Sequence, residues 1–248
     1  MLRHVARPAV RLFLFHHAGG SGTLFDGWAE RLPADWDVVP LEAPGRGAKR
    51  TVPPCVDAAG LAEHFRQEIR PGTDVPYAFF GHSMGALVAH ELAQRLWQDG
   101  EPGPIWLGLS SCVAPGRAGT VTARSGLSDR ALQDWLVSLG GTPAEVVRHP
   151  FVWSMLGPVL RGDLRVVESW RPTPAVPPTG TPFTVFGSTD DDLVPVAQLR
   201  EWQDVGDHVR IRLHQGGHFY LQARPEPLID QIAAAVQACL TEKEGIAR

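Results

Sequence analysis

The chain has few of the features that mark secreted, membrane-spanning or metal-binding proteins. Its three cysteines, Cys55, Cys112 and Cys239, are too few and too scattered for a disulfide framework or a zinc site. No apolar run approaches the roughly 20 residues needed to cross a bilayer. The N-terminal segment MLRHVARPAV also lacks the continuous apolar stretch of a signal peptide. We therefore expect a cytoplasmic protein that does not enter a membrane.

The chain also lacks an excess of positive charge. It has 23 Lys plus Arg against 27 Asp plus Glu, a formal net charge of −4, whereas nucleic-acid binders usually show a strong basic excess. Hydrophobic residues make up 44% and charged residues 20%, so the chain can bury a full core, unlike a disordered protein. Its 248 residues fit a single α/β domain spanning 1–248.

What the sequence does contain is an alternation of short apolar runs with amphipathic helical stretches. Such an alternation predicts the α/β class, with a mostly parallel central sheet covered by helices on both faces. We predict strands at 10–17, 36–41, 77–80, 105–110, 184–188 and 209–213. We predict helices at 24–32, 56–69, 86–97 and 227–240.

One region departs from this alternation. Residues 114–171 contain no convincing strand but have helical stretches at 128–139, 142–148 and 151–170. Ser128 is typical of a helix start, and Gly140-Gly141 of a helix end. We predict that this region is a helical lid insertion above the carboxyl edge of the sheet, where open α/β sheets bind ligands.

The segment from Gly81 to Gly85 matches the motif G-x-S-x-G, the nucleophile elbow of α/β-hydrolases. A predicted strand precedes the motif and a predicted helix follows it, which is the context that the motif requires. A sharp turn between strand and helix exposes the serine hydroxyl, and only small neighbours fit the strained backbone. The motif therefore predicts Ser83 as a nucleophile in an α/β-hydrolase fold.

A nucleophilic serine needs a base and a carboxylate that orients the base. In α/β-hydrolases these residues follow the serine in the chain order acid, then histidine. His218 follows the last predicted strand, in the segment GGHFYL, and Asp190, Asp191 and Asp192 follow the preceding one. We expect His218 to be the base and Asp191 the acid, because Val194 lies three residues later and can anchor the loop. Asp190 and Asp192 remain alternatives.

The negative charge that develops on the substrate needs two backbone donors. One should be the amide of Met84, the residue after the nucleophile, and the other should lie in the glycine-rich loop after the first strand. We expect the amide of Ala18 to be the second donor. His16 and His17 precede it and are expected to be structural or to line the pocket, since adjacent strand residues face opposite sides. We expect neither a metal site nor a cofactor.

Several segments resemble the type II thioesterases that accompany polyketide and nonribosomal peptide synthetases. The LGGTPAEV and LRGDLRVVESW segments, both in the predicted lid, point to this family rather than to α/β-hydrolases in general. The matching segments are FHHAGGSG (15–22), PLEAPGRG (40–47), FFGHSMGALVAHELA (79–93), LGGTPAEV (139–146), LRGDLRVVESW (160–170), VFGSTDDDLV (185–194) and GGHFYL (216–221).

The resemblance implies a catalytic triad of Ser83, Asp191 and His218 and oxyanion donors at Met84 and Ala18. Where the family often has Asp-Pro in the acid loop, this chain has Asp191-Asp192. The implied activity is the removal of unwanted acyl groups from the phosphopantetheine arm of acyl or peptidyl carrier proteins. We expect a monomer without a cofactor.

Three other functions fit the same residues. The first is a medium-chain fatty acyl thioesterase or a general carboxylesterase of the same fold. The second is a chain-terminating, cyclising thioesterase; since the chain starts at Met1 and ends in the charged segment TEKEGIAR, we expect a free-standing enzyme instead. The third is a binding protein of hydrolase fold without activity.

The charge of the predicted lid differs from that of the remaining chain. Residues 114–171 have seven arginines and five acidic residues, a net charge of +2, which leaves −6 elsewhere. Carrier proteins are generally acidic, so a basic lid favours docking; a solvated helical surface with incidental arginines gives the same count. Apolar lid residues are candidates for an acyl chamber or for helix packing alone. They are Trp135, Leu139, Phe151, Trp153 and Met155.

Overall fold

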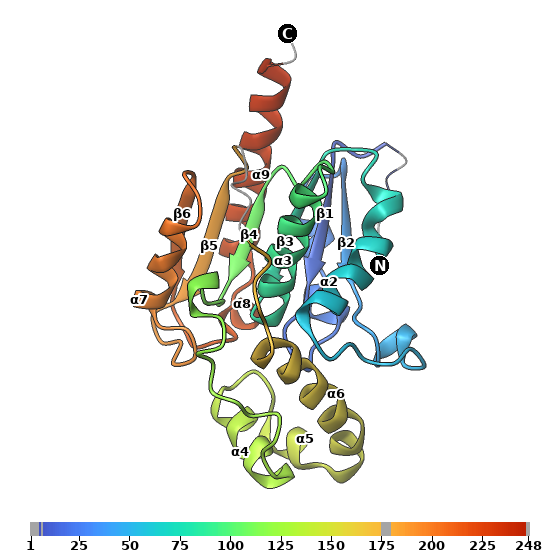
Figure 1. Ribbon diagram of the computed structural model, residues 1–248, viewed down its shortest axis with the longest axis vertical. Coiled ribbons are helices and arrows are strands. Elements are labelled where there is room, and N and C mark those ends of the chain that lie inside the picture. The colour runs from blue at the N-terminus through green and yellow to red at the C-terminus, as the bar shows by residue number, and fades with distance from the viewer. Residues whose placement is uncertain (1–4, 6, 175–179, 247–248) are drawn as a thin grey trace.

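A six-stranded sheet forms the centre of the computed structural model, which describes residues 5, 7–174 and 180–246. The strand order is β2-β1-β3-β4-β5-β6, and the five pairings between neighbours are all parallel. This arrangement confirms the predicted α/β class (Figure 1). The strands are β1 (Val10–Phe15), β2 (Trp36–Leu41), β3 (Tyr77–His82), β4 (Leu107–Ser110), β5 (Phe183–Ser188) and β6 (Val209–His214).

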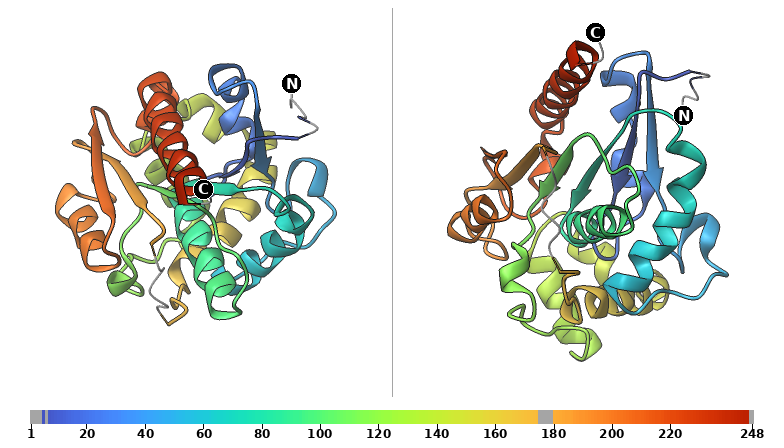
Figure 2. Two further views of the ribbon diagram at one scale, coloured as in Figure 1. Left: turned by 90° about the horizontal axis from the view of Figure 1, so that it is seen from above. Right: turned by 45° about the horizontal axis from the view of Figure 1, so that its top comes forward.

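Helices cover both faces of this sheet. The side chains of a strand alternate between the two faces, and in β1 both sets are apolar and buried. In β1, Phe13 and Phe15 pack with α2 and α3, whereas Leu12 and Leu14 pack with α1 and α9 on the other face. Figure 2 shows α9 and α3 on opposite sides of the sheet. These helices are α1 (Trp28–Arg31), α2 (Ala58–Ile69), α3 (Met84–Gln98) and α9 (Glu226–Ile246).

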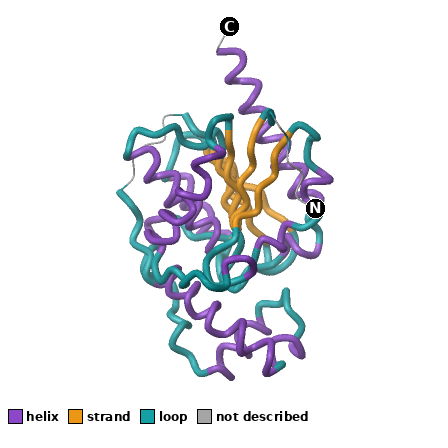
Figure 3. Tube along the Cα trace, turned by 90° about the vertical axis from the view of Figure 1, so that its right-hand side faces the viewer, coloured by secondary structure: helices purple, strands orange, loops and turns teal. Residues whose placement is uncertain are grey.

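Three helices between β4 and β5 form a separate layer beyond one end of the strands (Figures 1 and 3). They are α4 (Asp129–Ser138), α5 (Ala144–Arg148) and α6 (Pro150–Glu168). A small apolar core holds them together, built from Leu132, Leu136, Val147, Trp153, Leu160 and Leu164. We call residues 114–171 the helical insertion. It lies at the carboxyl edge of the sheet, because β1 and β3 both run into the loops that face it.

The end of the insertion is fixed to the body by a buried carboxylate on α3. Glu91 is 1% exposed and accepts hydrogen bonds from the indole nitrogen of Trp170 and from the backbone and hydroxyl of Thr173. Val166 and Trp170 are also part of the apolar core beneath α3. The carboxyl-terminal half of α6 therefore belongs to the rigid body of the protein.

Local signals in the sequence account for most of the boundaries of the elements. The hydroxyl of Ser128 caps α4 by accepting from the amide of Ala131, and Gly140 and Gly141 end the helix at positive φ, as predicted. The prediction of one helix over 24–32 is wrong. Gly27 adopts φ 82° and divides this segment into a 3₁₀ turn and the short α1.

Two short helices were not predicted from the sequence: α7 (Val196–Leu199) and α8 (Tyr220–Ala223). Each has only four residues, too few to show a helical period. Among the described residues, no helix combines the length and the apolar composition needed to cross a bilayer.

Four histidines are expected to make the stability of the fold dependent on pH: His16, His82 and His90 are at most 2% exposed, and His17 is partly buried. Burial lowers the pKa of His16 to about 3 and the pKa values of His17 and His90 to about 4. Burial also holds the pKa of His82 well below its ordinary value. These rings are neutral in the folded protein at pH 5.5, whereas the unfolded chain binds protons there.

We therefore expect the free energy of unfolding to be nearly constant between about pH 7 and 8 and to fall as the pH drops below about 6.5. The loss should be about 1 kcal/mol for each of the four histidines at pH 5.5. Urea unfolding at pH 7.5 and 5.5 measures this loss. His90→Gln should make the pH dependence shallower, whatever its effect at pH 7.5. Equal midpoints at pH 7.5 and 5.5 would contradict burial of neutral rings.

Candidate active site

Ser83 occupies a strained backbone position between β3 and α3. Its φ of 55° and ψ of −119° are rare for a residue with a side chain, and its amide donates to the carbonyl of Ser110 at 2.8 Å. The chain reverses from strand to helix within this one residue. The hydroxyl is thereby exposed at the carboxyl edge of the sheet, and the amino-terminal end of α3 lies directly beneath it.

The two glycines of the motif are required by close contacts between backbones. A Cβ atom on Gly85 would lie 2.1 Å from the carbonyl oxygen of Phe15, and one on Gly81 would lie 2.3 Å from that of Gly85. Backbone atoms cannot yield as a flexible side chain can. The G-x-S-x-G pattern therefore follows from the packing of α3 against the ends of β1 and β3.

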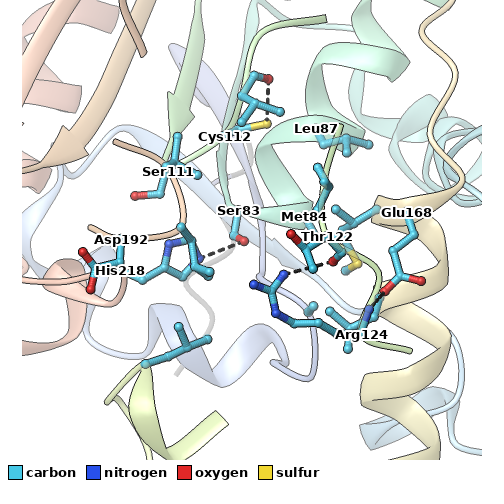
Figure 4. Close-up of a pocket in the computed structure, with 18 of the residues that line it drawn as sticks. Ser83, Met84, Leu87, Ser111, Cys112, Thr122, Arg124, Glu168, Asp192 and His218 are labelled. Carbon is cyan, nitrogen blue, oxygen red and sulfur yellow. Dashed lines mark hydrogen bonds between the residues drawn. The ribbon is translucent and has the colours of Figure 1, made fainter. Parts of the chain in front are cut away.

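Ser83, His218 and Asp191 form a continuous chain of hydrogen bonds. His218 Nδ1 donates to Asp191 Oδ2 at 2.9 Å, and Nε2 then accepts from the Ser83 hydroxyl at 3.0 Å. Figure 4 shows the His218 ring directed toward Ser83. The carboxylate fixes the tautomer of the imidazole, which leaves Nε2 free to take the serine proton.

The three consecutive aspartates have separate environments. Asp191 is 4% exposed, and its second oxygen accepts from the amides of Leu193 and Val194 at 2.9 and 3.1 Å. Burial alone would raise the pKa of Asp191, but the hydrogen bonds from His218 and Val194 outweigh it and leave the pKa lowered. Asp190 and Asp192 are exposed, and the Asp190 carboxylate accepts from the amide of Gly216 instead. Asp191 is therefore the carboxylate that contacts His218.

A buried aromatic cluster holds the His218 ring in place. The ring of His82 lies 5.1 Å from it between centroids, and its Nδ1 is 2.8 Å from the hydroxyl of Ser110, which in turn contacts the hydroxyl of Tyr220 at 2.7 Å. Because the pKa of His82 is far below its ordinary value, this neighbour stays neutral when His218 gains a proton. A second charge beside an imidazolium is thereby avoided.

Met84 and Ala18, whose amides are the predicted oxyanion donors, both lie at the cavity beside Ser83. Met84 begins α3, where the amides have no acceptor within the helix. His16 holds the loop before Ala18: its Nδ1 donates to the carbonyl of His17 and its Nε2 accepts from Ala43. His17 packs against Phe219.

A cavity of about 260 Å³ opens beside the Ser83 hydroxyl. Its walls come from the body and from the helical insertion, and Figure 4 shows Arg124 and Glu168 of the insertion beside Met84. Apolar side chains of α4 and α6 form much of the lining. They include Trp135, Leu136, Leu139, Leu160, Leu164 and Val167.

The five apolar residues that were candidates for an acyl chamber or for helix packing alone divide into three groups. Trp135 and Leu139 line the cavity, whereas Trp153 is buried in the core of the insertion. Phe151 and Met155 are 66% and 57% exposed and are outside the lining, so their assignment to a chamber is wrong. Both lie in the first turns of α6, on its solvent side.

The site also contains an ion pair that the sequence analysis missed. Arg46 and Asp163 meet beside the loop that contains Ala18. Both lie in segments that were quoted only for their resemblance, and they are 117 positions apart in the sequence. The available signal in the sequence was an aspartate at position 163 between Leu160 and Leu164, on the side of the helix that the apolar residues mark as buried.

Comparisons with known proteins agree with this geometry. Residues 10–236 match the family model described as a thioesterase domain. The chain is 34% identical over 233 residues to the probable cadicidin biosynthesis thioesterase of Streptomyces griseus, spanning 92% of this chain and 63% of that protein. A solved structure of RedJ, a thioesterase from the prodiginine biosynthetic pathway in Streptomyces coelicolor, has a TM-score of 0.83 and 33% identity, covering 92% of this chain and 86% of that one. The type II thioesterase BorB from the borrelidin biosynthetic cluster is similar at a TM-score of 0.83 and 33% identity, with 94% of each chain covered.

Replacement of each aspartate separately tests which carboxylate acts on His218. Asp191→Asn should slow the labelling of Ser83 by a fluorophosphonate probe by about 10³- to 10⁴-fold, because the amide no longer fixes the reactive tautomer. Asp190→Asn and Asp192→Asn, the matched controls, should label within about threefold of the unaltered protein. Fast labelling of Asp191→Asn together with slow labelling of either control would assign the acid to that control position.

Proposed function

Because the chain belongs to the thioesterase family, a family of hydrolases that act on thioesters, we propose that it releases acyl groups from the phosphopantetheine arm of acyl or peptidyl carrier proteins. Its task in this proposal is editing: it clears stalled or wrongly loaded arms of polyketide or nonribosomal peptide synthetases. The relatives named above belong to cadicidin, prodiginine and borrelidin biosynthesis.

One observation carries the proposal: a serine hydroxyl hydrogen-bonded to a histidine–carboxylate pair opens onto a largely apolar cavity. The hydroxyl of Ser83 lines this cavity together with His218, Met84 and Ala18. The apolar walls suit an acyl chain, and its carbonyl carbon then lies beside the nucleophile.

The first half of the reaction transfers the acyl group to the enzyme. His218 Nε2 takes the proton of Ser83 while the serine oxygen attacks the thioester carbonyl carbon. The amides of Met84 and Ala18 stabilise the negative charge on the carbonyl oxygen. The carbon–sulfur bond then breaks, and the departing thiolate takes the proton from His218 Nε2.

The second half releases the acid by the same steps with water as nucleophile. His218 Nε2 takes a proton from water, whose oxygen attacks the acyl-serine carbonyl carbon. The carbon–oxygen bond to Ser83 breaks, and the serine oxygen recovers the proton from His218. The Asp191 carboxylate stays ionised throughout and stabilises the transient imidazolium.

In this proposal the helical insertion acts as the lid over the acyl group and as the docking surface for the carrier protein. Its net charge of +2 favours an acidic partner. Four of its seven arginines are already paired with carboxylates: Arg117 with Glu201, Arg130 and Arg148 with Asp134, and Arg161 with Asp129. Asp129 and Asp134 are already counted in the net charge of +2, and Glu201 outside the insertion offsets one further charge, which leaves +1. Electrostatic attraction is therefore a modest part of docking.

The nucleophile is tested by Ser83→Ala, which should lower kcat for a short acyl thioester by about 10⁴- to 10⁶-fold, because acyl transfer to the enzyme is lost. Ser169→Ala removes an exposed hydroxyl and serves as the matched control. Thiol release measures both rates. Near-normal turnover by Ser83→Ala would exclude the scheme.

The substrate class is tested by comparing one acyl group on a carrier protein, on a small thiol and on nitrophenol. A carrier-bound thioester should have the largest kcat/KM, and its KM should rise about two- to fivefold between 50 and 500 mM NaCl as salt screens the acidic partner. The KM of the small thioester should not change. A preference for the nitrophenyl ester would favour a general carboxylesterase.

A further inference from the structure

The ion pair between Arg46 and Asp163 is almost fully withdrawn from water. The two guanidinium nitrogens Nη1 and Nη2 donate to the two carboxylate oxygens, both at 2.6 Å. The side chains of Arg46 and Asp163 are 8% and 3% exposed. The pair joins the loop after β2 to helix α6 of the insertion, which are far apart in the sequence.

Both partners also hold the backbone of the loop that follows β1. Asp163 Oδ2 accepts from the amide of Gly19 at 2.7 Å, and Arg46 Nη1 donates to the carbonyl of Gly20 at 2.9 Å. A hydrogen bond from the amide of Gly20 to the carbonyl of His17 closes the turn around Ala18. The residues on the far side of Ala18 are thus fixed by the ion pair, while His16 fixes those before it.

Helix α6 also limits the position of this loop by contact. Gly19 adopts φ 74°, and a Cβ atom there would lie 3.1 Å from a methyl group of Leu160. Leu160 is one turn from Asp163 on α6, so any side chain at position 19 would meet the same helix that holds the Gly19 amide. The absence of a side chain at Gly19 is what lets the loop approach α6 closely enough for this hydrogen bond.

Stability alone does not account for such a pair. Burying two charges costs several kcal/mol of desolvation, and an apolar pair of similar volume is often as stable. Arg46 Nε is in addition buried with no hydrogen-bond partner among the described residues. The pair instead fixes the backbone of the loop after β1, because it binds the amide of Gly19 and the carbonyl of Gly20.

We propose that the Arg46–Asp163 ion pair is a positioning element that aims the amide of Ala18 at the oxygen of the reacting carbonyl. The inference rests on the proposed function in so far as Ala18 is an oxyanion donor there. Such a donor must lie about 2.7–3.1 Å from the charged oxygen, and a displacement of about 1 Å can cost on the order of 100-fold in rate. Substrate binding in the cavity does not depend on that distance.

Asp163→Asn tests this role, because it removes the charge while keeping the size of the side chain. We expect kcat for a short acyl thioester to fall about 10- to 100-fold with KM changed less than about threefold, because only the transition state loses a contact. The rate of fluorophosphonate labelling should fall in parallel, since the phosphoryl oxygen needs the same donors.

The matched control is Asp37→Asn at the opposite end of the sheet. Asp37 pairs with Arg11 at 2.8 Å between the first residues of β1 and β2, and its side chain is 8% exposed. Loss of this pair should lower the melting temperature about as much as Asp163→Asn does, yet leave kcat unchanged. An equal loss of kcat in both variants would assign the effect of Asp163→Asn to general destabilisation and overturn the proposal.

A double variant separates position from stability more sharply. Arg46→Met with Asp163→Leu replaces the pair by apolar side chains, which should restore the melting temperature toward that of the unaltered protein. If the pair positions Ala18, kcat stays low in this stable variant, because Gly19 and Gly20 have lost their partners. Recovery of kcat together with the melting temperature would overturn the proposal.

The labelling assay also distinguishes this inference from the proposed function. If the unaltered protein labels at Ser83 but hydrolyses no thioester, the proposed function fails. Slower labelling of Asp163→Asn than of Asp37→Asn still supports the positioning role in that case. If thioester hydrolysis depends on Ser83 but both the labelling rate and kcat of Asp163→Asn are normal, the inference fails and the proposed function stands.

Discussion

The close approach of α3 to the ends of β1 and β3 is the constraint on which the site depends. A Cβ atom on Gly85 would lie only 2.1 Å from the carbonyl oxygen of Phe15. A Cβ atom on Gly81 would lie 2.3 Å from the carbonyl oxygen of Gly85. This contact forces Ser83 into its strained conformation and brings the first amide of α3 next to its hydroxyl. It also sets the loop after β1 close to the same point, so that Ala18 and Met84 line one cavity with Ser83. The positions of the proposed nucleophile and of both proposed donors thus follow from a single packing contact.

The buried carboxylate beside His218 has fixed partners, and the buried rings around it are neutral. Asp191 is held by His218 and by two backbone amides, and the nearby rings of His16, His17 and His82 stay neutral because burial lowers their pKa values. An imidazolium on His218 would face the Asp191 carboxylate with no added cation from these three rings. A charged neighbour at this range would repel it, so the neutrality of the three rings supports the role proposed for His218.

The sequence predicted those features that depend on chain order and on local pattern. Strands of a parallel sheet end at one edge, so Ser83, Asp191 and His218, each just after a strand, were expected to meet, and the structure brings them within hydrogen-bond distance. Val194 three residues after Asp191 was the reason to prefer that aspartate, and its amide does bind the carboxylate. The helix at 24–32 was mispredicted because the φ of Gly27 breaks an otherwise regular pattern. The Arg46–Asp163 pair was missed because no periodicity links positions so far apart; only the packing of α6 on the loop after β1 brings them together.

Helix α6 contributes both to the wall of the cavity and to the position of the loop that contains Ala18. Leu160 and Leu164 line the cavity, and Asp163 between them reaches the amide of Gly19. The carboxyl-terminal half of this helix is packed into the core beneath α3 through Val166, and Trp170 just after the helix joins the same core. The opposite wall comes from α4, whose Leu132 and Leu136 share one apolar core with Leu160 and Leu164. Ala18 and Trp135 both pack against this core. A change in the size of the chamber at Trp135 would therefore also act on the loop that contains Ala18, so the acyl preference and the position of that loop are coupled through one core.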